Sequence, residues 1–394
     1  MKKKISLLAF LTCLTINAFA QNYEVDGIYY HCNYEIAVVT KGPQSNYYSG
    51  DIIIPEFIIY NDFTSRVESI DDEAFKNAKN LTSVVIPESV TSIGERAFSC
   101  CDNLTSVVIP NSVSEIGDGA FEYCKNLTSI VIPESTTQIG SSVFTGCTNL
   151  TNLVFNAQNL NSCSALRSLP IQTLVIGEKV TVIPNSAFNS NQKLNSITIP
   201  NSVKRIGSRA FVDCTNLTDV IIGDSVRIIG HNAFSGCTNL KNVTLGTNVS
   251  FINYRAFSGD KNIRTIISKN ITPPVCNNYS GYSNAPVFES VKVEYLSLIV
   301  PQESISLYET ADTWRDFWNI LGKDYSNIEE PIADDVNISA EDGNIVINGV
   351  ENEKVEVYSV NGQCVYSGRA TNIPVTAKGL YIVKVNDKPF KVMM

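Results

Sequence analysis

A pattern that recurs every 23 residues limits this chain to few architectures. Residues 80–100 read NLTSVVIPESVTSIGERAFSC, and residues 103–123 read NLTSVVIPNSVSEIGDGAFEY. Gly94 therefore returns as Gly117, and Phe98 returns as Phe121. A period of this length is typical of a solenoid, in which one short unit cannot bury its apolar side alone and must stack on its neighbours. The sequence therefore predicts a mainly β solenoid.

An aromatic column shows how far the array extends. Its members follow one another at steps of 22 or 23 residues: Phe75, Phe98, Phe121, Phe144, Leu166, Phe188, Phe211, Phe234 and Phe257. Leu166 belongs to the column because Ala165-Leu166 replaces Ala-Phe and restores the register. We predict nine turns over residues 65–268, with one irregular unit in the middle.

Each unit contains a strand with the pattern Leu-x-x-Val-x-Ile, as in Leu104, Val107 and Ile109. These residues should point inward and the residues between them outward, because side chains alternate along a strand. A Gly, Asn or Asp then recurs, as at Gly94 and Gly117. Such residues tolerate a positive φ, so we predict a left-handed turn at this column. Pro184 stands in the same column and predicts a different turn there.

The cysteines favour packing over redox or metal chemistry. Ten of the 11 cysteines follow the predicted leader, and an even number in a secreted chain invites a disulfide interpretation. Half of these ten fall in one column, three residues after the aromatic: Cys101, Cys124, Cys147, Cys214 and Cys237. Ala78 and Leu169 also occupy it. We predict free thiols in a small buried apolar site, although a bond between stacked turns is geometrically conceivable. Cys100 is predicted to be an exposed thiol.

Residues 109–127 carry the signature Ile-Pro-x-Ser-Val-x-x-Ile-Gly-x-x-Ala-Phe-x-x-Cys-x-x-Leu. This pattern resembles the BspA-like leucine-rich repeat, and the resemblance covers residues 65–268, with departures in residues 156–184. It implies a surface protein that binds host extracellular proteins or other cells, without implying any particular ligand.

The segments before the array suggest a leader and a cap. Residues 1–20 combine three lysines, an apolar core and the Ala-Phe-Ala motif of a secretory signal peptide. Thr12 precedes Cys13 where a lipoprotein signal needs a small residue, so we favour simple secretion over lipid anchoring. Residues 21–64 should form an N-terminal β cap that shields the open end of the core.

The segments after the array suggest a cap, a linker and a small domain. We predict a C-terminal cap over residues 269–326, with one helix over residues 305–321 because apolar residues recur there at helical spacing. Residues 327–335 read NIEEPIADD and form a predicted linker. Residues 336–394 show short alternating strands and an Asn361-Gly362 hairpin signal, which predict a small antiparallel β-sandwich.

The last part of the chain carries a second resemblance. Residues 357–362 read VYSVNG, residues 378–385 read KGLYIVKV, and Lys391-Val392 lies near the end. This combination is similar to the C-terminal sorting domain of the type IX secretion system. The resemblance implies export across an outer membrane, with removal of the domain or anchoring at the surface. An accessory sandwich that is never cleaved is the alternative.

Composition excludes several partner classes. The net charge is −9, and loss of Lys2, Lys3 and Lys4 with the leader takes it to −12 (−9 minus 3). An acidic chain without a basic run is a poor candidate for binding nucleic acid or anionic lipid. No stretch reaches the ~20 apolar residues that a transmembrane helix needs. We therefore expect a secreted protein at the outer-membrane surface or in the extracellular space.

We find no motif for an enzyme, a cofactor or a metal ion. His31 and His231 are the only histidines. His31 is beside Cys32, and a Cys-His nucleophile is conceivable, but a surface pair in a hairpin is the favoured interpretation. His231 occupies a variable position of the repeat, which favours a solvated surface residue. The acidic run of residues 71–73 is best explained as a solvated turn, with weak cation binding as an alternative.

One surface recurs along the array. The outward residues of the strands form two columns on the side expected to be concave, with β-branched residues beside small hydroxyl and amide groups. The first column is Val85, Val108, Val131, Val154, Val175, Thr198, Ile221, Thr244 and Ile267. The second column includes Ser83, Ser106, Ser129 and Asn152. β-Propensity alone can explain these columns, but an exposed apolar stripe on a monomer also marks a contact surface.

Two hypotheses follow from these columns. In the first, the array is a non-catalytic adhesion module that binds a protein ligand, such as a host matrix protein or another surface protein. In the second, the array is a structural module that packs on another copy or on a partner without a host ligand. A hydrolase has no support in the sequence.

Overall fold

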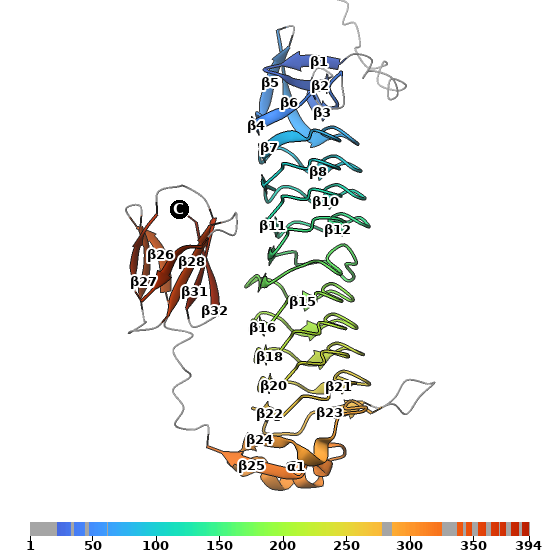
Figure 1. Ribbon diagram of the computed structural model, residues 1–394, viewed down its shortest axis with the longest axis vertical. Coiled ribbons are helices and arrows are strands. Elements are labelled where there is room, and N and C mark those ends of the chain that lie inside the picture. Colours follow the sequence, from blue (N-terminus) through green and yellow to red (C-terminus); the bar gives the residue numbers. More distant parts are fainter. Residues whose placement is uncertain are drawn as a thin grey trace, which may run out of the picture.

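The computed structural model describes residues 22–32, 35–43, 47–60, 62–277 and 286–324, and seven stretches of the C-terminal part: 337–341, 344–348, 354–359, 364–369, 371–375, 380–385 and 388–393. Figure 1 shows a long stack of turns with a separate small β domain beside it. The stack is a β-solenoid of about eleven turns, which confirms the predicted fold class. The predicted leader and linker lie outside the described residues.

One side of the stack is formed by parallel strands of three to six residues, and we call its outer surface the long-strand face. The strands are β4 (Ser49–Ile53), β7 (Asn80–Val85), β9 (Ser106–Val108), β11 (Ser129–Ile132), β13 (Asn152–Phe155), β14 (Thr173–Ile176), β16 (Ser196–Ile199), β18 (Asp219–Ile222), β20 (Asn242–Leu245), β22 (Thr265–Ser268), β24 (Ser297–Pro301) and β25 (Asn319–Lys323). Because β24 and β25 continue the parallel ladder beyond β22, the stack has more turns than the nine that the aromatic column predicts.

A second side carries parallel strands that, apart from the eight-residue β6, are only two or three residues long. They are β6 (Phe63–Ile70), β8 (Ser92–Ile93), β10 (Glu115–Ile116), β12 (Gln138–Ile139), β15 (Val182–Ile183), β17 (Arg205–Ile206), β19 (Ile228–Ile229), β21 (Phe251–Asn253) and β23 (Val275–Asn277). The Ala-Phe turns form the third side and place their aromatic rings in the core.

Stacked rings run through most of the core. Phe75, Phe98, Phe121 and Phe144 stack with centroids 4.8, 5.1 and 5.7 Å apart. A second stack begins at Phe188 and ends at Phe288 in the C-terminal cap. Leu166 interrupts the column, as the sequence predicts, and Phe155 of β13 fills the gap with its ring edge-on to Phe188, 5.7 Å between centroids.

The two caps differ in how well the sequence predicts them. At the N-terminus, β1 (Asn22–Val25), β2 (Ile28–Cys32) and β3 (Ile36–Thr40) form the expected antiparallel β cap, and β5 (Phe57–Tyr60) pairs with β6. At the C-terminus, the prediction of one helix over residues 305–321 is wrong. The helix α1 (Ile305–Thr310) stops after six residues, and a 3-10 turn at Trp314–Asp316 leads into β25.

The backbone leaves the helical conformation at two positions. Ala311 is extended (φ −76°, ψ 138°), and Thr313 has a φ of +74°, which no α-helix allows. The bent path still buries Tyr308 and Trp314, and the Trp314 indole N–H donates to the Pro274 carbonyl at 2.8 Å. Trp318 is 82% exposed, so the helical spacing of the apolar residues does not define one buried face.

The glycine column serves close packing, not a left-handed turn. A Cβ on Gly117 would lie 2.6 Å from the backbone nitrogen of Glu95 in the preceding turn. Positive φ occurs two residues later, at Arg96 (51°) and Gly119 (60°). Ser186, two residues after Pro184, has a φ of 58°, so the predicted difference in that turn is also wrong.

The cysteine column is buried and reduced. All ten described cysteines are free. The Cys101 thiol donates to the Phe75 carbonyl of the preceding turn at 3.1 Å, and the same bond recurs from Cys124, Cys147, Cys214 and Cys237. Burial raises the pKa of Cys147 and of Cys214 to about 12, so these thiols stay protonated. Cys100 is half-buried rather than fully exposed.

The C-terminal residues form two small antiparallel sheets, which we call the tail domain. One contains β26 (Asn337–Glu341), β27 (Asn344–Asn348) and β30 (Asn372–Pro374). The other has the order β29 (Cys364–Gly368), β28 (Val355–Ser359), β31 (Leu380–Val385) and β32 (Lys388–Met393). Ile345, Val357 and Val383 belong to a core of its own. The predicted hairpin turn at Asn361-Gly362 lies outside the described residues.

Candidate protein-binding face

The first predicted column forms a stripe on the long-strand face, carried by three sheets that follow one another along the stack. Strand register aligns Val85 with Val108, and it extends the stripe beyond the array to Ile53 at one end and Leu321 at the other. In order, the stripe contains Ile53, Val85, Val108, Val131, Val154, Val175, Thr198, Ile221, Thr244, Ile267, Ile299 and Leu321. Sequence reasoning missed Ile53, Ile299 and Leu321 because the repeat signature fails in the caps.

The ends of the stripe are open to solvent. Val85 is 42% exposed and Val108 is 51% exposed, while Ile53 is 73% exposed. On the other side of the middle, Ile221 is 44% exposed. Aliphatic side chains this exposed, aligned on neighbouring strands, form the kind of patch that a partner would bury.

The second column supplies small polar groups beside the stripe. Near the N-terminal end, the hydroxyls of Ser83 and Thr82 donate to Asp51 Oδ1 at 2.6 and 2.7 Å. These two bonds, Ser83 first, lower the pKa of Asp51 and hold it as a carboxylate. Farther along, the Asn242 amide donates to Asp219 Oδ1 at 2.7 Å. The column is thus partly organised by its own hydrogen bonds, and Ser106, Ser129 and Asn152 continue it across the middle.

The middle of the stripe differs from its ends. Val154 is 3% exposed and Val175 is 4% exposed, although both side chains point outward from the sheet. They form a small apolar cluster with Ile382 of the tail domain, and Val131 and Tyr358 pack at its edge. Figure 1 shows the tail domain beside the long-strand face, level with the middle turns. The predicted site residues therefore lie in one surface, but the tail domain covers part of it.

One signal in the sequence points to this contact. Strand β31 reads LYIVKV, and Tyr381, Ile382 and Val383 are apolar on both of its faces. A strand that is apolar on both sides is typical of burial on both sides. The sequence does not show which surface covers the outer side.

The remaining sites give no support to catalysis. Within the described residues, no group of three or more His, Cys, Asp or Glu side chains could hold a metal ion. His31 Nδ1 lies 3.6 Å from Asp71 Oδ2, while burial raises the pKa of the neighbouring Cys32 to about 11, which disfavours a thiolate nucleophile. His231 packs against Tyr254 at 4.2 Å between ring centroids, and burial lowers its pKa.

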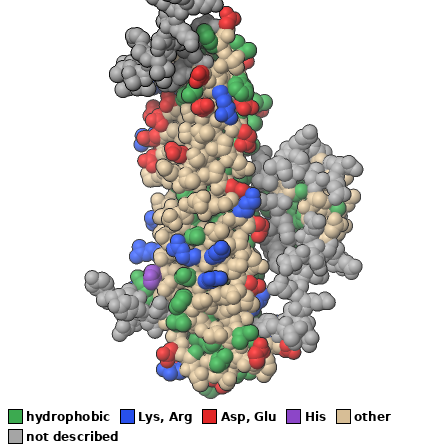
Figure 2. All heavy atoms as spheres, turned by 180° about the vertical axis from the view of Figure 1, so that it is seen from behind, with side chains coloured by type: hydrophobic (Ala, Val, Ile, Leu, Met, Phe, Trp, Pro, Cys, Tyr) green, Lys and Arg blue, Asp and Glu red, His purple; other side chains and the backbone are tan. Residues whose placement is uncertain are grey.

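Neighbouring protein groups interact with the carboxylates of the acidic run at residues 71–73. Asp72 Oδ1 accepts a hydrogen bond from the Glu95 backbone at 2.6 Å, and Glu73 pairs with Lys76 at 2.5 Å. Figure 2 shows acidic side chains gathered over the N-terminal part of the stack and basic ones across its middle. These groups support turns of the solenoid, which explains the run without a cation.

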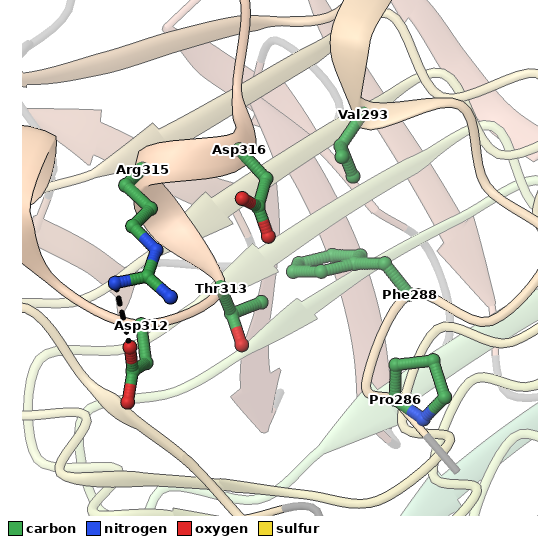
Figure 3. A pocket seen from close by; sticks show the side chains of 7 residues that line it. All are labelled: Pro286, Phe288, Val293, Asp312, Thr313, Arg315 and Asp316. Atoms are coloured by element: carbon green, nitrogen blue, oxygen red, sulfur yellow. Dashed lines mark ion pairs between the residues drawn. The ribbon is translucent and has the colours of Figure 1, made fainter.

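A cavity of about 460 Å³ lies in the C-terminal cap, lined by Pro286, Phe288, Val293, Asp312, Thr313, Arg315 and Asp316. Figure 3 shows Arg315 paired with Asp312 and directed away from the Phe288 ring. The Arg315 Nη1 to Asp312 Oδ1 distance is 3.1 Å. Because the one basic group is engaged at the rim, the cavity does not present converging polar groups to a ligand.

The fold and the surface together define a leucine-rich repeat solenoid, a class that typically serves as a non-catalytic binding scaffold. The chain belongs to the BspA type leucine-rich repeat family, whose model matches six copies over residues 57–164 and 161–279. The family resemblance predicted from the repeat signature is confirmed.

Solved structures of bacterial leucine-rich repeat proteins are similar to the chain at low identity. A leucine-rich cell surface protein from Faecalibacterium prausnitzii is 20% identical, with 77% of this chain and 95% of that one covered and a TM-score of 0.29. The pneumococcal vaccine antigen PcpA is 16% identical, with 77% and 98% covered and a TM-score of 0.35. A comparison with curated proteins found no significant match. Among the described residues, no helix is long and apolar enough to cross a membrane.

Proposed function

We propose that this protein is a secreted or cell-surface adhesion protein that binds a protein ligand through the long-strand face. The observation that carries the proposal is the stripe from Ile53 to Leu321, aligned by strand register within each of its three sheets and open at Val85 and Val108. The stripe and the column of small polar residues beside it contain only two charged residues, Asp51 and Asp219. Depletion of charge and a flat apolar centre with small polar neighbours suit a protein–protein contact.

Membership of the BspA-type family supports the same class of function, since leucine-rich repeat proteins generally bind proteins. We infer that the ligand is an extracellular protein, either of the host matrix or of another cell surface. The contact requires no cofactor and no metal ion, because desolvation of aliphatic side chains supplies the driving force.

The test uses charged substitutions on two faces of the same chain. Val85→Asp and Val108→Asp place a carboxylate on the stripe, and Phe251→Asp is the matched control, because Phe251 is also 42% exposed but lies in β21 on the other side. Binding to a panel of host matrix proteins is measured by surface plasmon resonance. We expect the first two variants to weaken binding by at least about tenfold, since each buries a charge at the contact.

The Phe251→Asp control distinguishes damage to the long-strand face from a general loss of the folded structure. Phe251→Asp should bind as the unmodified chain does. Equal loss of binding in all three variants, or no loss in the Val85 and Val108 variants, would remove the long-strand face from the proposal. Absence of binding to every panel member, both in the unmodified chain and with Ile382→Asp to loosen the tail domain from the stripe, would contradict the matrix ligand.

We further infer that the tail domain directs export and surface attachment, as its resemblance to a type IX sorting domain implies. The residues of that resemblance include β31 and much of β28, which are neighbours in the same sheet. Mass spectrometry of the protein recovered from the cell surface tests this role. We expect loss of the residues after about Asp335, or a modification at that point. An intact, unmodified C-terminus would favour a permanent accessory domain.

A further inference from the structure

The sheet of the tail domain that contains β28 and β31 has an apolar outer side. Tyr358 and Ile382 face each other across these two strands. Their neighbours Val357 and Val383 point into the core of the tail domain, so Tyr358 and Ile382 point out of it. Ile382 is nevertheless only 4% exposed, so a surface outside the tail domain must cover it.

The covering surface is the middle of the stripe. The exposed fractions of valines in the stripe can be compared directly, because these residues have the same side chain at different positions along the stack. Val108 is 51% exposed, whereas Val154 is 3% and Val175 is 4% exposed. The two buried valines share one apolar cluster with Ile382. The difference in exposure therefore comes from the tail domain and not from the array.

Interactions within the tail domain fix the orientation of the Tyr358 ring. Its hydroxyl donates to Glu356 Oε2 at 3.0 Å, and Lys384 Nζ lies 5.4 Å from the ring centroid. Glu356 also pairs with Lys354 at 2.7 Å. The polar groups of this face are thus engaged with one another, which leaves Ile382 and the Tyr358 ring as its apolar contact with the array.

We propose that the tail domain is an intramolecular occupant of the stripe, seated on Val154 and Val175 through Ile382 and Tyr358, and that it closes the binding face against external proteins. The face opens when the tail domain detaches. The docking itself is independent of the proposed function, but the blocking of an external ligand rests on it.

The tether can reach this seat. Twelve residues separate Asp324 from Asn337, and a chain of that length spans at most about 45 Å. The seat on β14 lies six strand positions from β25 along the ladder, or about 29 Å at ~4.8 Å per strand. A tether of this size gives a local concentration of roughly millimolar, so even a weak contact keeps the tail domain docked.

The seat also leaves little room for a ligand at the N-terminal end. Ile53 to Val108 covers two strand steps, or about 10 Å. A standard protein interface covers about 800 Å² on each partner, which is close to 30 Å across. A ligand centred on Val85 and Val108 in such an interface reaches about 15 Å to either side along the stack. It therefore extends over Val131 to Val154, where it competes with the tail domain.

Disulfide trapping in the full chain tests the docking without any ligand. Two cysteines are introduced by Val154→Cys and Ile382→Cys, in a background with Cys100→Ser, Cys276→Ser and Cys364→Ser so that the native thiols that are not buried are removed. Oxidised glutathione is the electron acceptor. The matched control is Val108→Cys with Ile382→Cys, because Val108 lies in the same column outside the cluster.

We expect an intramolecular disulfide between residues 154 and 382, identified as a linked peptide pair by mass spectrometry, at a rate at least about tenfold above the control. A bond found only between two molecules would show that a second copy takes the seat and would overturn the proposal. Equal cross-linking in both pairs, or none in either, would overturn it as well. None of these results depends on whether the protein binds a matrix protein.

Discussion

At the scale of single residues, the cysteine column is a set of hydrogen-bond donors. Each thiol donates to an aromatic residue's carbonyl one turn back, for example Cys124 to Phe98 at 3.1 Å. Asn191 occupies the column and does the same, because its amide nitrogen donates to the Leu166 carbonyl at 3.0 Å. The sequence predicts burial and free thiols correctly, but its description of the site as merely apolar is incomplete.

Asp260 is the exception in this column. It is fully buried, and neither carboxylate oxygen has a well-formed hydrogen bond among the described residues. Burial raises its pKa from 3.8 to about 8, against the opposing effect of the nearby Cys237 and Gly236 amides. The folded state therefore binds a proton that the unfolded state releases between pH 4 and pH 8. Stability is full below the unfolded pKa and is lost as the pH rises toward 8.

We predict that Asp260→Asn stabilises the protein at pH 8. The asparagine can donate to the preceding turn as Asn191 does, and it removes a charge penalty on the order of a few kcal/mol. Thermal unfolding of both proteins should show a large gain at pH 8 and a small one at pH 4. A gain that is equal at the two pH values would contradict the buried carboxylate as its cause.

At the scale of the element, the irregular turn shows how the core tolerates a missing aromatic. Phe155 stands where other units have an isoleucine, such as Ile132, and its ring occupies the gap left by Leu166. Two substitutions in different elements, a turn and a strand, therefore compensate each other. Volume is conserved locally although the repeat signature is broken.

This compensation predicts coupling between the two positions. Phe155→Ile should destabilise the protein by about 1–3 kcal/mol because it leaves a cavity, and Leu166→Phe alone should cost a similar amount by overpacking. The double variant should recover most of the loss. Urea unfolding of the four proteins gives the coupling free energy, and strictly additive effects would contradict the shared space.

Periodicity explains why so much of the array follows from the sequence. A residue such as Phe121 has the same neighbours in every regular turn, so one column predicts one environment. The prediction fails where neighbours differ. Gly117 is required by the approach of the Glu95 backbone, which no propensity reveals, and the segment near Thr313 bends against the solenoid end instead of forming a long helix.

At the scale of the whole molecule, the candidate face could be predicted but its occupant could not. The stripe follows from alternation in each strand, since Val108 and Val154 occupy equivalent positions. The tail domain covers Val154 and not Val108. This difference depends on the contact between Val154 and Ile382, which are more than 200 residues apart in sequence. One sequence carries no signal for the pairing of two apolar surfaces that many partners would fit.

The same apolar stripe therefore serves two occupants in this account, the tail domain and an external protein. Affinity for a matrix protein, measured for the Val154→Cys and Ile382→Cys chain with the disulfide formed and then reduced, tests this claim most directly. The unmodified chain under both conditions is the control. We predict at least about tenfold tighter binding after reduction, because the tail domain can then leave the seat and the ligand can compete for it. Equal affinity in the two states would contradict the claim that ligand and tail domain share one face.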